Sequence, residues 1–187
     1  MKYQVRSNPL LSACGLNCGL CPQYTLHTNG KFKCPGCAGV GFPEAHPSCG
    51  VLTCCMGKGI EYCWLCGEYP CKKYENADAA DSFITHKNQS KDVNKAMQIG
   101  IDAYMAELNE KIPILQNLLA NYNDGRKKGF FCIAVNLLEL DDVKCVMQQI
   151  ESETNPGDTI KEKAKTAARL FQAAADERGI SLKLRRG

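Results

Sequence analysis

The stretch Cys14-Gly15-Leu16-Asn17-Cys18-Gly19-Leu20-Cys21 opens a segment in which cysteine recurs at short intervals. Eleven of the chain's 13 cysteines lie between Cys14 and Cys71. Three pairs have the spacing Cys-x-x-Cys, namely Cys18/Cys21, Cys34/Cys37 and Cys63/Cys66. Two thiolates at this spacing can bind one metal ion from a tight loop, and two such pairs complete a tetrahedral site. The segment is therefore predicted to bind metal, with two zinc ions as the expected cofactor.

Cysteines at this density can also form disulfides, but disulfides need an oxidising compartment. The first nine residues contain no apolar run of the kind found in signal peptides. Leu11-Ser12-Ala13-Cys14 has the local look of a lipoprotein cleavage site, yet the hydrophobic stretch that must precede such a site is missing. No segment approaches the roughly 20 apolar residues that span a bilayer. We therefore expect a cytoplasmic protein with no membrane contact, whose thiols are reduced and bind metal.

There are more candidate ligand side chains than two tetrahedral zinc ions can coordinate. The local partition gives the first ion to the pairs Cys18/Cys21 and Cys34/Cys37. It gives the second ion to Cys49, Cys54 and the pair Cys63/Cys66, with His46 and Cys71 as rivals, and Cys14 is surplus. Interleaved pairings remain open, because spacing alone does not exclude them. The full candidate set is Cys14, Cys18, Cys21, Cys34, Cys37, His46, Cys49, Cys54, Cys63, Cys66 and Cys71.

The remaining cysteines are predicted to have no role in metal binding. Cys55 directly follows Cys54, and adjacent residues seldom both reach one ion, so a free thiol is expected there. Cys132 and Cys145 lie on apolar helical faces and are interpreted as small core residues.

An iron–sulfur cluster is the main alternative to zinc. The spacing Cys14-x-x-x-Cys18-x-x-Cys21 is that of radical S-adenosylmethionine enzymes. Those enzymes continue with a long series of alternating strands and helices, and they usually carry an aromatic residue where Leu20 stands. Neither feature is present here, so this interpretation is rejected. Cluster binding by another subset of cysteines stays open, although the four-cysteine ferredoxin run is absent.

The predicted fold is mostly α. Residues 1–75 form a small irregular cysteine-rich module of short helices and knuckles, and residues 76–187 form an α-helical bundle expected to pack as one compact unit. In the module, Pro22 and Asn29-Gly30 predict a helix over 22–29, and Ser48 is expected to cap a helix ending at Gly57 or Gly59. Pro70 could open a third helix. Residues 76–89 are expected to form a linker.

Apolar periodicity predicts about four or five helices in the second part. Val93, Met97, Ile101, Tyr104 and Leu108 share one helical face, which Pro113 is expected to interrupt or restart. The apolar run 130–138 fits a buried helix or a buried strand, and helix is chosen because helical patterns flank it. Asp141 is expected to cap the next helix. Thr159 and Glu162 form a capping-box pattern, and Gly179 is expected to end the final helix.

Charge and residue types narrow the function. Net charge is +3, with five basic against three acidic residues in 1–71 and 18 against 17 in 72–187, so nucleic-acid binding is not expected. The three histidines and the carboxylates suggest no nucleophile–base pair, which favours a non-enzymatic role. An all-thiolate zinc site is usually closed and structural.

The motifs Cys14 to Cys21, Cys34-Pro35-Gly36-Cys37, Cys63-Trp64-Leu65-Cys66 and Tyr69-Pro70-Cys71 together resemble the cysteine-rich prokaryotic domain-of-unknown-function family thirty-seven ninety-five. The stretch 122–132 and the lysine-rich final helix are similar to longer members. The resemblance implies zinc binding and no particular reaction. Members usually have a cysteine where His46 stands, and a Cys-to-His exchange preserves zinc ligation.

Three functional hypotheses follow. The first is a structural zinc protein that acts as a binding or adaptor module, which would imply a protein partner. The second is an iron–sulfur or thiol-redox protein. The third is a nucleic-acid-binding zinc-finger protein, against which the near-neutral charge counts.

Overall fold

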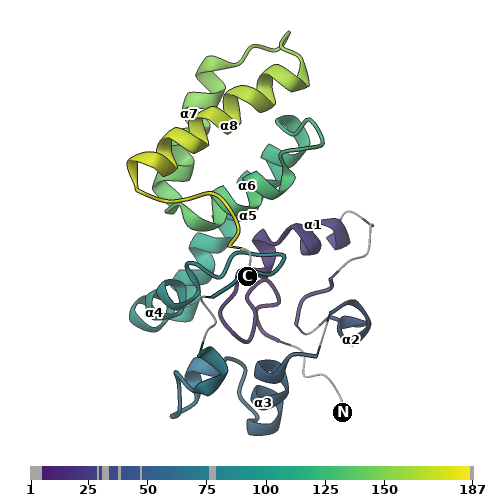
Figure 1. The fold of residues 1–187 in the computed structure, drawn as a ribbon, viewed down its shortest axis with the longest axis vertical. Helices are drawn as coiled ribbons and strands as arrows, with labels where there is room; N and C mark the ends of the chain where they lie inside the picture. The colour runs from purple at the N-terminus through teal and green to yellow at the C-terminus, as the bar shows by residue number, and fades with distance from the viewer. Residues whose placement is uncertain are drawn as a thin grey trace. The chain divides into compact units, whose positions relative to one another are not determined.

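Figure 1 shows the computed structural model, which describes residues 6–28, 30, 34–37, 39–46, 48–75 and 79–185. The described residues form helices and turns without any β-strand, which confirms the mostly α prediction. The chain divides into two compact units. The first, called here the cysteine-rich unit, comprises residues 1–105 with 185–187, and the second, the helical unit, comprises residues 106–184. The division therefore lies about 30 residues beyond the expected position after residue 75.

The cysteine-rich segment contains only short helices. Helices α1 (Pro22–Thr28), α2 (Phe42–Ala45) and α3 (Gly50–Lys58) alternate with single 3₁₀ turns at Cys18–Leu20, Cys63–Leu65 and Lys72–Tyr74. Helix α1 confirms the helix predicted over 22–29, whose residue 29 lies outside the described residues. Helix α3 begins one residue later than expected, because Cys49 rather than Ser48 is its N-cap. Gly59 ends α3 in the left-handed conformation, as predicted.

Residues beyond the last cysteine belong to the cysteine-rich unit because their side chains bond to its first loop. Gln89, the first residue of α4 (Gln89–Ile99), donates to the carbonyl oxygen of Cys14 at 2.7 Å. The Asn17 amide donates to Asp92 at 2.9 Å and accepts from the Tyr104 hydroxyl at 2.9 Å. These contacts tie α4 and the first residues of α5 (Ile101–Asn121) to the cysteine-bearing loop. The drop in cysteine content after residue 71 therefore does not mark the edge of the folded unit.

The helical unit is built from the rest of α5, α6 (Lys128–Leu137), α7 (Leu140–Glu153) and α8 (Ile160–Glu177). Helices α7 and α8 form a hairpin, and α6 also contacts α8 (Figure 1). Phe131 and Phe171 meet edge to face with ring centroids 6.1 Å apart. These two rings and Ile150 have no exposed side-chain surface, so the unit has a conventional apolar core.

Several helix boundaries differ from the predicted ones. The apolar face from Val93 to Leu108 is divided between α4 and α5, because Gly100 adopts φ 87° and ψ 151°. Pro113 lies inside α5, which continues through it. Glu139 rather than Asp141 is the N-cap of α7. The capping box of Thr159 and Glu162 at the start of α8 is confirmed.

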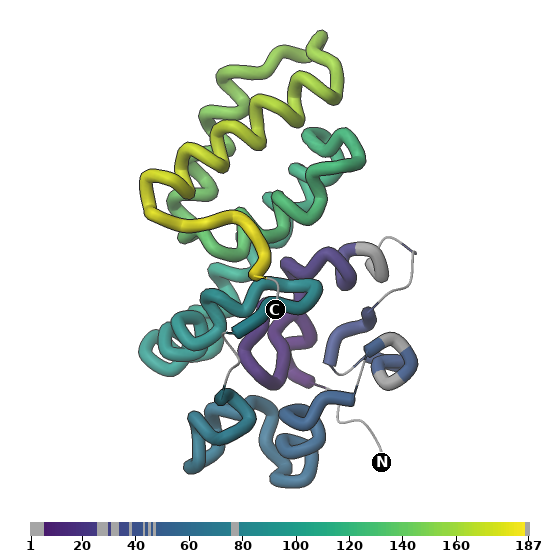
Figure 2. The backbone as a smooth tube through the Cα atoms, in the orientation of Figure 1, coloured from purple at the N-terminus to yellow at the C-terminus, as the bar shows by residue number. Residues whose placement is uncertain are grey.

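The end of the chain returns to the cysteine-rich unit. Figure 2 traces the last described residues to the loop 79–88, where the backbone N–H of Asp81 donates to the carbonyl oxygen of Arg185 at 3.0 Å. None of the helices in the described ranges combines the length and the apolar character that crossing a membrane requires.

Candidate metal centre

A cavity of about 320 Å³ lies within the cysteine-rich unit, and six cysteines line it. No disulfide joins any of the 13 cysteines. Apolar side chains such as Phe42, Val51 and Ile84 fill much of the remaining wall, which among the described residues includes no aspartate or glutamate. The sulfur and imidazole groups come from Cys14, Cys18, Cys21, Cys34, Cys37, His46, Cys49 and His86.

Tight backbone turns present these thiols to the cavity. Cys18 begins a 3₁₀ turn that closes when the N–H of Cys21 donates to the carbonyl of Cys18 at 3.0 Å. In the second pair, Gly36 adopts a φ of 80°, which a residue with a side chain rarely takes. A Cβ at Gly36 would also lie 3.4 Å from the carbonyl oxygen of Pro9. Both Cys-x-x-Cys segments therefore form compact turns with their cysteines on one cavity.

Backbone N–H groups point at several of the sulfurs. The backbone of Ala13 hydrogen-bonds the sulfur of Cys37, and the backbone of Gly36 bonds that of Cys34. The N–H of Leu52 donates to the Cys49 sulfur at 3.5 Å. Donors of this kind stabilise thiolate, which is the form of cysteine that binds metal.

The thiols on the wall are close enough to perturb one another. Burial raises the pKa of Cys14 to about 11, and the nearby Cys37 acts in the same direction. The Cys18 thiol hydrogen-bonds Cys37, which lowers the pKa of Cys37 to about 6 and raises that of Cys18 well above its ordinary value. The hydrogen bond thus favours ionisation of Cys37 over that of Cys18. Several thiolates together in this space would require a cation, because an unpaired buried charge is costly.

A buried arginine lies beside this group. The guanidinium of Arg6 donates to the carbonyl oxygens of Glu61 (2.7 Å) and Leu11 (2.9 Å), and its carbon lies 4.8 Å from the Tyr62 ring centroid. Its Nε is buried and has no hydrogen-bond partner among the described residues. The charge of Arg6 also contributes to the lowered pKa of Cys37, after the larger effect of Cys18. The surroundings of the cavity thus favour negative charge on its sulfurs.

The other candidate cysteines lie outside the wall of this cavity. Cys63 is buried and hydrogen-bonds Cys55, whose pKa burial raises to about 12. The sulfur of Cys66 instead accepts from the ammonium of Lys58 at 3.0 Å. Cys71 is the N-cap of the turn Lys72–Tyr74. Cys54 lies on α3 and is partly exposed.

The arrangement differs from the local partition. Cys49, grouped with the second ion on spacing, lines the same cavity as Cys18 and Cys37, and so does the surplus Cys14. His46 lines it too. Across the described ranges, no three His, Cys, Asp or Glu side chains are already arranged to hold a metal ion. Which of the candidates are ligands stays a prediction.

His86 is the wall residue that sequence reasoning missed. It lies 15 positions after Cys71, with no knuckle spacing to any cysteine. Only the folding of the loop 79–88 back onto the cysteine-bearing turns brings His86 to the cavity. No pattern in the sequence could have indicated this contact.

Comparison with known proteins gives one match. Residues 10–76 match the family model described as "Protein of unknown function (DUF3795)". Neither curated proteins nor solved structures give a match. The matched range contains every cysteine on the cavity wall and ends before His86. Over residues 10–76 the chain thus resembles the uncharacterised, cysteine-rich family DUF3795, as its motifs predict.

Proposed function

We propose that the cysteine-rich unit is a zinc-binding module in which zinc–thiolate bonds organise the turns between Cys14 and Cys49. The zinc is structural, and the protein acts as a binding or adaptor module rather than as an enzyme. The observation that carries this proposal is the gathering of six thiols and His46 around one cavity of about 320 Å³.

The donor set supports zinc over the hard divalent cations. Thiolate and imidazole select zinc, copper(I) or iron–sulfur clusters, whereas magnesium and calcium bind through oxygen. The described wall offers thiols, imidazoles, hydroxyls, amides and the ammonium of Lys73, but no carboxylate. A wall without a carboxylate also lacks the acidic general base that many hydrolytic zinc sites use. The thiols and imidazoles therefore fit a structural site.

The contacts between sulfurs favour an interleaved ligand set. Cys18 hydrogen-bonds Cys37, which belongs to a different Cys-x-x-Cys pair. Cys14 interacts electrostatically with both Cys37 and Cys49. Three turns that are separate in sequence would thus be joined by one ion. The second ion stays a prediction, and of the ligands predicted for it this arrangement leaves Cys54, Cys63 and Cys66, with Cys71 as the rival.

The test is metal analysis of the full-length protein purified without oxygen. We expect at least one zinc per chain, no visible absorption, and loss of the folded cysteine-rich unit on chelation. Trp64, the chain's one tryptophan, is buried in this unit and reports on it by fluorescence. Metal-free protein with the same Trp64 emission in the presence and absence of chelator would refute the proposal.

An iron–sulfur cluster is the second candidate, and the size of the cavity favours it. Sulfurs about 2.3 Å from a single zinc ion enclose very little space. A cavity of about 320 Å³ has room for a centre with several metal atoms. A brown anaerobic preparation that contains acid-labile sulfide would establish this alternative in place of zinc.

A further inference from the structure

The loop 79–88 forms part of the cavity wall. In the sequence it comes after all the predicted ligands. Ser82, Phe83, Ile84 and His86 from this loop line the cavity together with the cysteines. The family-matched range ends at residue 76, so this part of the wall lies outside it. Any ligand supplied by the loop would therefore be a feature of this chain beyond its DUF3795 segment.

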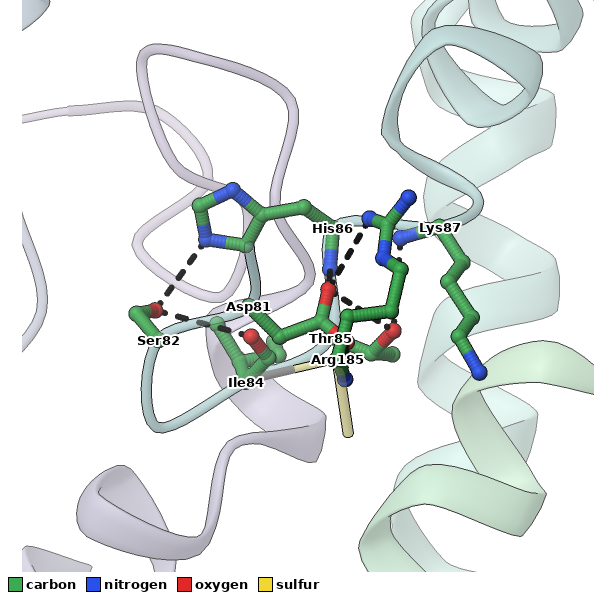
Figure 3. A network of polar contacts seen from close by, with 7 residues as sticks. All are labelled: Asp81, Ser82, Ile84, Thr85, His86, Lys87 and Arg185. Atoms are coloured by element: carbon green, nitrogen blue, oxygen red, sulfur yellow. Dashed lines mark hydrogen bonds and ion pairs between the residues drawn. The ribbon is translucent and has the colours of Figure 1, made fainter. Parts of the chain in front are cut away.

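The loop is fixed by a buried carboxylate and the end of the chain. The side chain of Asp81 has no exposed surface, and one of its oxygens accepts from the Arg185 guanidinium at 3.0 Å. Its other oxygen accepts from the backbone N–H of Arg185 at 2.7 Å. The backbone N–H of His86 donates to the same carboxylate at 2.7 Å. Figure 3 shows that this network fixes the backbone on which the His86 ring is mounted.

The hydroxyl of Ser82 lies beside the ring of His86. Ser82 Oγ is 3.1 Å from His86 Nε2, and which of the two atoms donates depends on the tautomer of the ring (Figure 3). The same oxygen is 3.5 Å from the carbonyl oxygen of Ile84, toward which its hydrogen can also point. When Ser82 accepts from Nε2–H, Nδ1 carries the lone pair of the ring. Histidines that bind metals show this pattern, in which one nitrogen donates to a fixed acceptor and the other binds the ion.

We propose that His86 is a nitrogen ligand of the metal centre, bound through Nδ1, so that the loop 79–88 completes a mixed thiolate–imidazole site. This inference rests on the proposed function, since it requires that the cysteines on the same cavity bind a metal ion. It assigns Asp81, Ser82 and Arg185 positioning roles, because they hold the loop and the ring and do not themselves bind the ion.

The test follows the histidine rings of the full-length protein by NMR during zinc addition. The chain has only three histidines, so ¹⁵N-histidine labelling gives three resolvable rings, which variants such as His86→Gln assign. Zinc is removed anaerobically, returned stepwise, and counted by metal analysis in the same sample. We expect the His86 ring of the metal-loaded protein to be the Nε2–H tautomer. In a sample loaded with ¹¹³Cd²⁺ in place of zinc, we expect its Nδ1 signal to be split by coupling to the metal, which refolding of the unit alone would not produce.

A competition assay with a zinc-binding dye supplies a second measurement. Ser82→Ala removes the acceptor of the ring N–H, and we expect it to weaken zinc affinity about 10–100-fold while His86 Nδ1 still responds to zinc. Metal that binds without coupling to His86 Nδ1 would overturn the role of His86 and leave the zinc module intact. A protein that takes up no zinc would overturn both.

Discussion

Replacing Gly15 by alanine should destabilise the cysteine-rich unit more than the same substitution at Gly59. Gly15 adopts a φ of 90°, and a Cβ there would lie 2.3 Å from Cγ2 of Val93. Val93 is 1% exposed and sits on α4, which Gln89 and Asp92 fasten to the same loop. Since a β-branched side chain has one strongly preferred rotamer in a helix, Val93 cannot easily turn aside. The loop or the helix must move instead.

The expected loss has two parts. An L-residue in the left-handed region costs roughly 1–2 kcal/mol. Forcing a methyl group into a packed contact costs about 1–3 kcal/mol more. Gly15→Ala should therefore lower the free energy of unfolding of the unit by about 2–5 kcal/mol. Gly59→Ala is the matched control, because Gly59 has a φ of 66° and no atom within 4 Å of its added Cβ.

Urea unfolding followed by Trp64 fluorescence measures this difference directly. The ring of Trp64 lies 3.5 Å from the added Cβ and is buried in the same unit. Gly59→Ala should show the backbone cost alone, roughly 1–2 kcal/mol. If the two variants lose equal stability, then the close approach of Gly15 to Val93 does not exist, and the attachment of α4 to the cysteine-bearing loop is wrong.

Four further predictions test the site and the helical unit. Cys37→Ser should reduce the zinc content of anaerobically purified protein, whereas Cys132→Ser, buried in α6, should leave it unchanged. Arg185→Ala removes a charged donor from the buried Asp81 carboxylate, so it should cost about 1–3 kcal/mol in urea unfolding and speed hydrogen exchange in the loop 79–88. Thr159→Ala removes the N-cap of α8 and should cost about 1 kcal/mol by circular dichroism at neutral pH. Hydrogen bonds from the Thr159 side chain and backbone lower the pKa of Glu162, so its stabilising effect is present above its unfolded pKa of about 4.3 and is lost as the pH falls through the lower folded value. Glu162→Gln should lose this part of the acid dependence, and an unchanged acid transition in that variant would contradict the capping box.

Local signals in the sequence predicted local structure well. Pro22 at a helix start, the Thr159–Glu162 box and the apolar run of α6 each act within a few residues, and each element is present. The sequence does not predict the break at Gly100, because apolar periodicity continues through it and one glycine with a positive φ leaves no trace in that pattern. Pro113 predicts an interruption of the helix, but α5 continues through it, so this proline does not end a helix here.

The candidate site could be predicted as a set of residues but not as an arrangement. Spacing identified the six cysteines and His46 that line the cavity, because knuckles are local. Which knuckles meet depends on the path of the chain between them, and that path brings Cys49 to the cavity that Cys14, Cys18 and Cys37 also line. His86 reaches the cavity only through the bonds of Asp81 to Arg185, 104 residues further along the chain. A contact of that separation has no signature in a single sequence.

Cysteines form part of the packing around the candidate site, and this is the physical reason to expect a metal. The apolar cluster beside the cysteine-bearing turns has Ala13, Phe42, Leu52, Cys55 and Cys63 as its buried members, and the candidate ligands Cys34, Cys37 and Cys49 pack against it. The cysteine-rich unit also buries Leu11 and Leu20, but the segment that carries the turns has only short helices. Small segments of this kind are commonly stabilised by a metal or by disulfides. The free energy of metal binding to such a segment contributes directly to its folding, because the site does not exist in the unfolded chain. A chelator should therefore unfold the cysteine-rich unit, while the helical circular dichroism signal of the helical unit remains.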